Sequence, residues 1–135
     1  MRSGILLVED DPEDQFIFLD AIDSVEHAEP VHSENNGVDA LRYLQTLSSH
    51  QLPCIILADM NMPVMNGSEL LTHLKEHEQF RDIPVVIYTT SFNTLEKETC
   101  LRLGAHAYIT KPLSYRQSIE VARSIVQMCR QWQEL

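Results

Sequence analysis

Residues 54–59 are Cys-Ile-Ile-Leu-Ala-Asp, a run of five apolar residues that ends on a carboxylate. A strand that is apolar at every position is covered on both faces, which is typical of a parallel sheet between two helical layers. The runs 5–8 (Ile-Leu-Leu-Val) and 85–88 (Val-Val-Ile-Tyr) have the same character. We therefore predict three buried strands, with Asp59 directly after the clearest of them.

Segments with helical periodicity alternate with these strands. Helices are predicted after Asp11-Pro12, after Asn36-Gly37, after the loop 62–67, between Asn93 and Gly104, and from about Tyr115 onward. Weaker strands are predicted at 29–33, as an edge strand, and at 105–109. The first helix is expected to bury Phe16, Leu19 and Ile22, together with Ala21 or Val25, on one face. Five strand–helix units predict an α/β fold with three layers.

The size and charge of the chain exclude several classes of protein. The 135 residues suffice for one domain, with no Gly- or Pro-rich linker, so we expect residues 1–135 to form a single domain. Ten basic residues against 20 acidic ones give a net charge of −10. Binding to nucleic acid or to an anionic membrane surface requires basic residues, so neither is expected.

The cysteines and the apolar runs indicate the compartment. Cys54, Cys100 and Cys129 are far apart in sequence, odd in number and without a C-x-x-C pair. They are expected to be reduced thiols in a cytoplasmic protein. No apolar run is long enough to span a bilayer, and the run at 5–8 continues into acidic residues, unlike a secretory signal.

Polar residues follow the predicted strands in a consistent way. Glu9 and Asp10 come after the first, Asp59 after the third, Thr89 to Ser91 after the fourth, and Lys111 after the fifth. Because the carboxyl ends of parallel strands meet at one edge, we expect these four groups to converge there. Their convergence is a stronger signal than any one of the motifs.

This combination of side chains favours phosphoryl chemistry. Carboxylates gathered at one edge repel one another and need a cation, and all-oxygen ligands suit Mg²⁺. The Asp59 carboxylate could act as a nucleophile and accept a phosphoryl group. Lys111 would neutralise charge on the transferred oxygens, and the Thr89 hydroxyl could bond one of them.

Simpler interpretations account for some neighbouring residues. Asp11 precedes Pro12 and is expected to be a helix cap. His73 and His77 have the i, i+4 spacing of metal ligands, but they point away from the buried leucine stripe, so no zinc site is expected. For Tyr108, an ordinary core position and a ring that moves with Thr89 stay equally open.

The ordered set of residues resembles the receiver domain of bacterial two-component response regulators, over essentially the whole chain. The carrying residues are Val8-Glu9-Asp10-Asp11, Asp59-Met60-Asn61-Met62-Pro63 with Met65 and Gly67, Thr89, Gly104-Ala105, Tyr108 and Lys111-Pro112. Each motif alone is weak, but their order at the ends of the right strands is specific. The chain further resembles stand-alone regulators, including those paired with bacterial phytochromes.

The resemblance implies a flavodoxin-like sheet of order 2-1-3-4-5 and a site built around Asp59. Asp59 would be phosphorylated by a histidine kinase or a phosphotransfer protein. Asp10, Asp59 and the main-chain carbonyl of Asn61 would bind Mg²⁺ directly, with Glu9 acting through water. Lys111 would pair with the carboxylate and then with the phosphoryl group.

The resemblance also implies a conformational output. Thr89 would move to the phosphate and Tyr108 would rotate inward, which would change the surface that an unknown downstream protein binds. A homodimer would be sought on the face formed by the fourth helix, fifth strand and fifth helix.

Three other classes of function fit the sequence less well. A phosphohydrolase with an aspartyl nucleophile needs a carboxylic acid two residues later, where this chain has Asn61. A phosphate-independent interaction domain typically lacks one of Asp59, Thr89 and Lys111, and all are present. A flavodoxin-like cofactor binder needs a Gly- or hydroxyl-rich loop after the first strand, which is acidic here.

Overall fold

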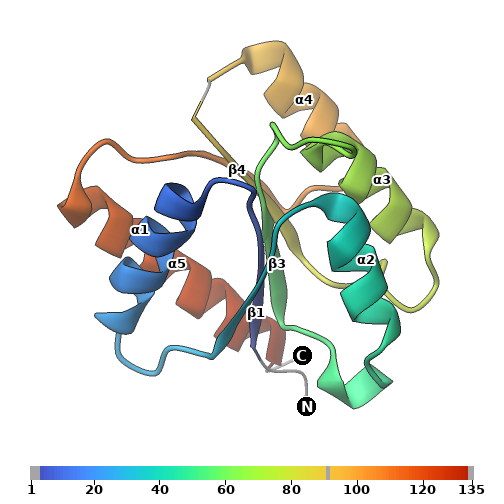
Figure 1. Ribbon diagram of the computed structural model, residues 1–135, viewed down its shortest axis with the longest axis horizontal. Helices are drawn as coiled ribbons and strands as arrows, with labels where there is room; N and C mark the ends of the chain where they lie inside the picture. The colour runs from blue at the N-terminus through green and yellow to red at the C-terminus, as the bar shows by residue number, and fades with distance from the viewer. Residues whose placement is uncertain (1–3, 91, 134–135) are drawn as a thin grey trace.

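The computed structural model describes residues 4–90 and 92–133, which fold around a five-stranded sheet (Figure 1). The strands are β1 (Ile5–Val8), β2 (Val31–Glu34), β3 (Ile55–Ala58), β4 (Val85–Thr89) and β5 (Ala107–Thr110). The helices are α1 (Pro12–Asp23), α2 (Gly37–Gln45), α3 (Gly67–Glu76), α4 (Thr94–Arg102) and α5 (Tyr115–Gln133), with a 3-10 turn η1 at Ser49–Gln51. All neighbouring strands pair in parallel, in the order β2-β1-β3-β4-β5, so the predicted fold is confirmed.

The central strands pack against helices on both faces. In β1, Leu6 and Val8 belong to the core layer beneath α2, α3 and α4, whereas Ile5 and Leu7 belong to the layer beneath α1 and α5 (Figure 1). All four residues are buried. A strand in this environment has no solvent-facing side, which explains why its sequence does not alternate between apolar and polar residues.

The buried face of α1 differs from the prediction. Phe18, Ala21 and Ile22 are buried, whereas Phe16 is 67% exposed and Leu19 is also exposed. Phe16 and Phe18 are two positions apart, so they lie about 200° apart around the helix and cannot share a face. Because α1 packs against both the sheet and α5, the stripe at Phe18 is the one that meets the core.

Asparagine caps define the start of three helices. Asn36, Asn66 and Asn93 each accept a hydrogen bond from the backbone N–H three residues later, which confirms the predicted start at Asn93. The helix that Asn93 caps ends at Arg102, and Gly104 follows with φ of +108°, a conformation that glycine adopts without strain.

Two of the three cysteines contradict the prediction of separate reduced thiols. Cys54, just before β3, and Cys129, on α5, form a disulfide with Cα atoms 5.1 Å apart. The pair is 75 residues apart in sequence, and both residues are buried in the core layer of α1 and α5. Their proximity comes from the packing of α5 on the sheet, so no local spacing motif could indicate it. Cys100 is a buried free thiol in the opposite layer.

Helix α5 is amphipathic. Its buried residues are Ser118, Ala122, Ile125, Val126 and Cys129. Trp132 is half-buried against the same core layer. Throughout the described part of the chain, every helix is too short or too polar to cross a bilayer.

Candidate functional site

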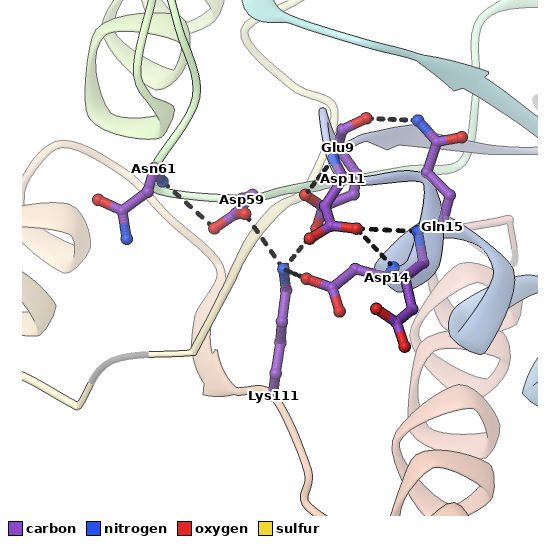
Figure 2. A network of polar contacts seen from close by, with 8 residues as sticks. Glu9, Asp11, Asp14, Gln15, Asp59, Asn61 and Lys111 are labelled. Atoms are coloured by element: carbon purple, nitrogen blue, oxygen red, sulfur yellow. Dashed lines mark hydrogen bonds and ion pairs between the residues drawn. The ribbon is translucent and has the colours of Figure 1, made fainter.

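The polar residues predicted to converge do meet at one edge of the sheet. Glu9 follows β1, Asp59 follows β3, Thr89 ends β4 and Lys111 follows β5. Figure 2 shows the carboxylates of Glu9 and Asp59 directed toward the Lys111 ammonium group. The backbone register explains the convergence. Val8 pairs with Ala58, Ala58 with Ile87, and Thr89 with Thr110, so the four strands end at one edge of the sheet, where β4 and β5 extend two residues further than β1 and β3.

The Lys111 ammonium group donates to three carboxylates. Its Nζ lies 2.5 Å from Glu9 Oε1, 2.9 Å from Asp14 Oδ2 and 3.1 Å from Asp59 Oδ2 (Figure 2). The Lys111 side chain is 8% exposed. A buried ammonium is stable in the fold only when it is paired and hydrogen-bonded, and these three contacts satisfy all of its N–H donors.

Sequence reasoning missed Asp14 as a partner of Lys111. Asp14 is in the first turn of α1, which starts directly at this edge of the sheet. The signal that could have revealed it is the position of Pro12 at the helix start, because first-turn side chains project toward the strand ends. Asp11, in contrast, is the predicted cap: its Oδ1 accepts from the Glu13 and Asp14 backbone N–H groups.

Three acidic residues lie close enough to hold a metal ion. Ligand atoms of Glu9, Asp10 and Asp59 all lie within 4.8 Å of one another. Glu9 and Asp59 are buried, whereas Asp10 is exposed, so the group is open to solvent on one side. Hard divalent cations prefer such oxygen donors, and Mg²⁺ in particular retains several waters, for which the open side leaves room. The donor set therefore fits a divalent cation.

The charges of this cluster perturb its own protonation. Burial raises the pKa of Glu9 to about 7, the hydrogen bond from Lys111 opposes this rise, and the nearby Asp59 charge adds to it. Burial alone would lower the pKa of Lys111, but the hydrogen bonds to Glu9 and Asp14 outweigh it and raise that pKa. Lys111 is therefore fully charged, and its single ammonium group faces three carboxyl groups.

The loop between β3 and α3 fixes Asp59 through main-chain contacts. Asp59 Oδ1 accepts from the Asn61 backbone N–H at 3.2 Å (Figure 2). The Gly67 N–H donates to the Met60 carbonyl at 2.9 Å, and a Cβ on Gly67 would lie only 2.6 Å from the Asp59 carbonyl oxygen. Gly67 is therefore required for the close approach of α3 to the residue that carries the carboxylate.

Thr89 is fully buried, and its hydroxyl has no hydrogen-bond partner among the residues that the structure describes. Unpaired buried hydroxyls are uncommon, because each loses its bonds to water without compensation. Thr90 is exposed, and Ser91 lies outside the described residues. The Thr89 hydroxyl is thus available for a group that enters the site.

Tyr108 is a core residue in this structure. Its ring is 8% exposed and belongs to the layer beneath α2, α3 and α4. Its hydroxyl donates to Glu96 Oε1 on α4 at 2.7 Å. Burial, together with this bond and the Glu96 charge, raises the pKa of Tyr108 to about 12. The ring thereby connects β5 to α4, beside the Thr89 end of the sheet.

The histidine pair is not part of any metal site that the described residues form. Glu9, Asp10 and Asp59 are the one group of His, Cys, Asp and Glu ligands found there, and it excludes His73 and His77. His73 is exposed, and the His77 ring stacks on Phe80 with centroids 4.0 Å apart.

Comparisons with known proteins point in one direction. The model of the response regulator receiver domain family matches residues 5–123. The polar-differentiation response regulator DivK of Brucella anthropi is 31% identical over 124 residues, which cover 92% of this chain and 96% of DivK. The transcriptional regulatory protein BaeR of Escherichia coli is 30% identical over 131 residues, or 97% of this chain, which spans about half (51%) of BaeR.

Solved structures give the same result. The phosphorylated cyanobacterial phytochrome response regulator RcpA superposes with a TM-score of 0.84 and 27% identity, covering 96% of this chain and 95% of RcpA. The Mn²⁺-bound form of the response regulator Rcp1 gives a TM-score of 0.80 and 27% identity, covering 91% of both chains. The latter similarity supports the divalent cation that the donor set fits.

Proposed function

Because this chain belongs to the response regulator receiver domain family, we propose that it accepts the phosphoryl group on the Asp59 carboxylate. Receiver domains of this family act as phosphoacceptors in two-component signalling, and the chain shares that function. One observation carries the assignment to Asp59: its Oδ2 accepts from Lys111 at 3.1 Å within the acidic cluster. Asp59 is the carboxylate that combines this contact with a position directly after the central strand.

The transfer is a nucleophilic substitution at phosphorus. An Asp59 carboxylate oxygen forms a bond to phosphorus, and the bond from phosphorus to the donor's imidazole nitrogen breaks. Charge develops on the transferred oxygens, where the Lys111 ammonium is already positioned to neutralise it. The Thr89 hydroxyl, which lacks a partner among the described residues, would donate to a phosphoryl oxygen. Tyr108 would then fill the space beside it.

Mg²⁺ is the proposed metal. Glu9, Asp10 and Asp59 would hold it, with the main-chain carbonyl of Asn61 as a further ligand and Glu9 acting through water. When bound, Mg²⁺ would neutralise the carboxylates and polarise the phosphoryl oxygens. The support for this assignment is that these residues offer oxygen ligands, which suit a hard divalent cation.

As a phosphoacceptor, this chain would act in signalling and not as an enzyme on a separate substrate. Asn61 follows Asp59 by two residues, and its amide is too weak an acid to act as a general acid. The domain would assist its own phosphorylation and dephosphorylation, and its output would be a changed surface.

The proposed partners follow from the same family. The donor would be a cytoplasmic histidine kinase or phosphotransfer protein, and the similarity to RcpA supports a kinase of the phytochrome class. A downstream protein or a second copy would bind the face of α4, β5 and α5. The net charge of −10 argues against nucleic acid and anionic membranes as direct partners.

Intact mass spectrometry tests the proposal. The protein is incubated with acetyl phosphate and Mg²⁺, beside an Asp59→Asn variant and a sample with chelator. We expect one phosphoryl adduct on the wild-type protein and none on the two controls. An adduct of equal yield on Asp59→Asn would refute the assignment, and so would the absence of any adduct when divalent cations also fail to bind.

A further inference from the structure

Lys111 has no N–H left for an incoming phosphoryl group. A lysine ammonium carries three donors, and Glu9, Asp14 and Asp59 already accept one each. A phosphoryl group on Asp59 would bring nearly two negative charges and three acceptor oxygens to the same place. It must therefore share Lys111 with the carboxylates already bound to it.

Of the three carboxylates, Asp14 is the one that attracts the Lys111 ammonium group away from Asp59. Figure 2 shows Asp59 on one side of the ammonium group and Asp14 on the α1 side. Glu9 and Asp59 belong to the group that fits a divalent cation, which would neutralise them, whereas Asp14 lies outside it. The Asp14 charge would thus persist in the metal-bound protein and continue to attract Lys111.

Asp14 is also the partner that Lys111 can release most easily. Its side chain is 29% exposed, compared with 2% for Glu9. Water can replace the lost hydrogen bond at Asp14, but a released Glu9 carboxylate would remain buried and unpaired. If Lys111 forms a stronger hydrogen bond to a phosphoryl oxygen, it would therefore lose the hydrogen bond to Asp14.

We propose that Asp14 is a positioning residue that competes with the phosphoryl group for the Lys111 ammonium and so limits the stability of the phosphorylated state. The inference rests on the proposed function, because it requires a phosphoryl group on Asp59. It also makes the first turn of α1 sensitive to phosphorylation, since the Asp14 carboxylate loses its partner when Lys111 moves.

Beryllium fluoride forms an anionic adduct on a carboxylate that mimics a phosphoryl group, so its affinity in the presence of Mg²⁺ measures this competition at equilibrium. Titration calorimetry at saturating Mg²⁺ compares the wild-type protein with Asp14→Asn, which keeps the size of the side chain and removes its charge. We expect Asp14→Asn to bind beryllium fluoride roughly two- to fivefold more tightly, the upper part of the range for a partly exposed ion pair. Asp14→Glu, which restores a carboxylate, is expected to return the affinity toward the wild-type value.

Glu13→Gln is the matched control. Glu13 is the exposed neighbour of Asp14 in the same helical turn, so this change removes the same charge from the same helix end without touching Lys111. Its affinity for beryllium fluoride should equal that of the wild-type protein.

The outcomes separate the two proposals. Equal or weaker binding by Asp14→Asn, or equal tightening by Glu13→Gln, would overturn the competition. An Asp14→Ala variant provides a second measurement with the same expected direction. If the wild-type protein binds beryllium fluoride no better than Asp59→Asn does, the proposed function itself fails.

Discussion

Substituting Gly67 with alanine should damage both the stability of the fold and the position of Asp59. A Cβ at Gly67 would lie 2.6 Å from the Asp59 carbonyl oxygen and 2.9 Å from Met60 Cα. Both contacts are to backbone, so neither can be relieved by rotation of a side chain. An ordinary contact between carbon and oxygen is about 3.3 Å, so α3 and the loop after β3 must separate by roughly 0.7 Å.

The size of the effect follows from the cost of overpacking. Forcing an extra methyl group into a packed site typically costs about 1–3 kcal/mol. For a chain of this length, 2 kcal/mol corresponds to a decrease in melting temperature of roughly 7 °C. The displaced loop also carries the Asn61 N–H that bonds Asp59. The rate of phosphorylation should therefore fall along with the stability.

Gly37→Ala provides a matched control. Gly37 is likewise the first residue of its helix, follows an asparagine cap and is buried. A Cβ there would meet the Met65 side chain, with Sδ at 2.8 Å, and a flexible methionine can move aside. We expect Gly37→Ala to stay within about 1 kcal/mol of the wild-type stability.

Urea unfolding and the rate of adduct formation with acetyl phosphate measure the two consequences. A Gly67→Ala protein as stable and as readily phosphorylated as Gly37→Ala would show that the loop tolerates the extra methyl group. The reasoning from backbone contact would then be wrong.

Three further predictions concern other positions. Val64 has φ of +70° and is 83% exposed, so Val64→Gly should relieve about 1 kcal/mol of backbone strain and leave the protein at least as stable in urea unfolding; a loss of stability would contradict this. Because the Cys54–Cys129 disulfide closes a 75-residue span, reduction should lower the unfolding free energy by up to about 4 kcal/mol, whereas Cys54→Ser should not respond to reductant. Burial raises the pKa of Glu9 from 4.5 to about 7, so without metal its contribution to stability is complete below pH 4.5 and disappears as pH rises through 7. Glu9→Gln should remove that part of the pH dependence, and identical stability profiles for both proteins in chelator would refute it.

The convergence of Glu9, Asp59, Thr89 and Lys111 could be predicted because it follows from topology alone. Once the apolar runs are recognised as parallel strands, the residue after each strand must lie at the same edge. The layer structure was predictable for the same reason, since the runs at 5–8 and 54–58 have no polar face to present to solvent.

Other features depend on packing that the sequence does not encode locally. Phe16 and Phe18 are equally apolar, and the packing of α1 against the sheet and α5 decides that Phe18 is buried. The pairing of Cys54 with Cys129 requires the register of α5 on the sheet. Asp14 reaches Lys111 because α1 begins at the edge of the sheet where Lys111 lies. An acidic first turn is common in helices without any such contact.

The Thr89 hydroxyl, which has no hydrogen-bond partner among the described residues, sets a compromise between stability and the capacity to respond. Valine has nearly the same shape and would fill this fully buried position without a polar atom to satisfy. Threonine at this position therefore leaves the unphosphorylated protein less stable than valine would. A protein optimised only to withstand heat would lose the hydroxyl and, with it, the means to register an arriving anion.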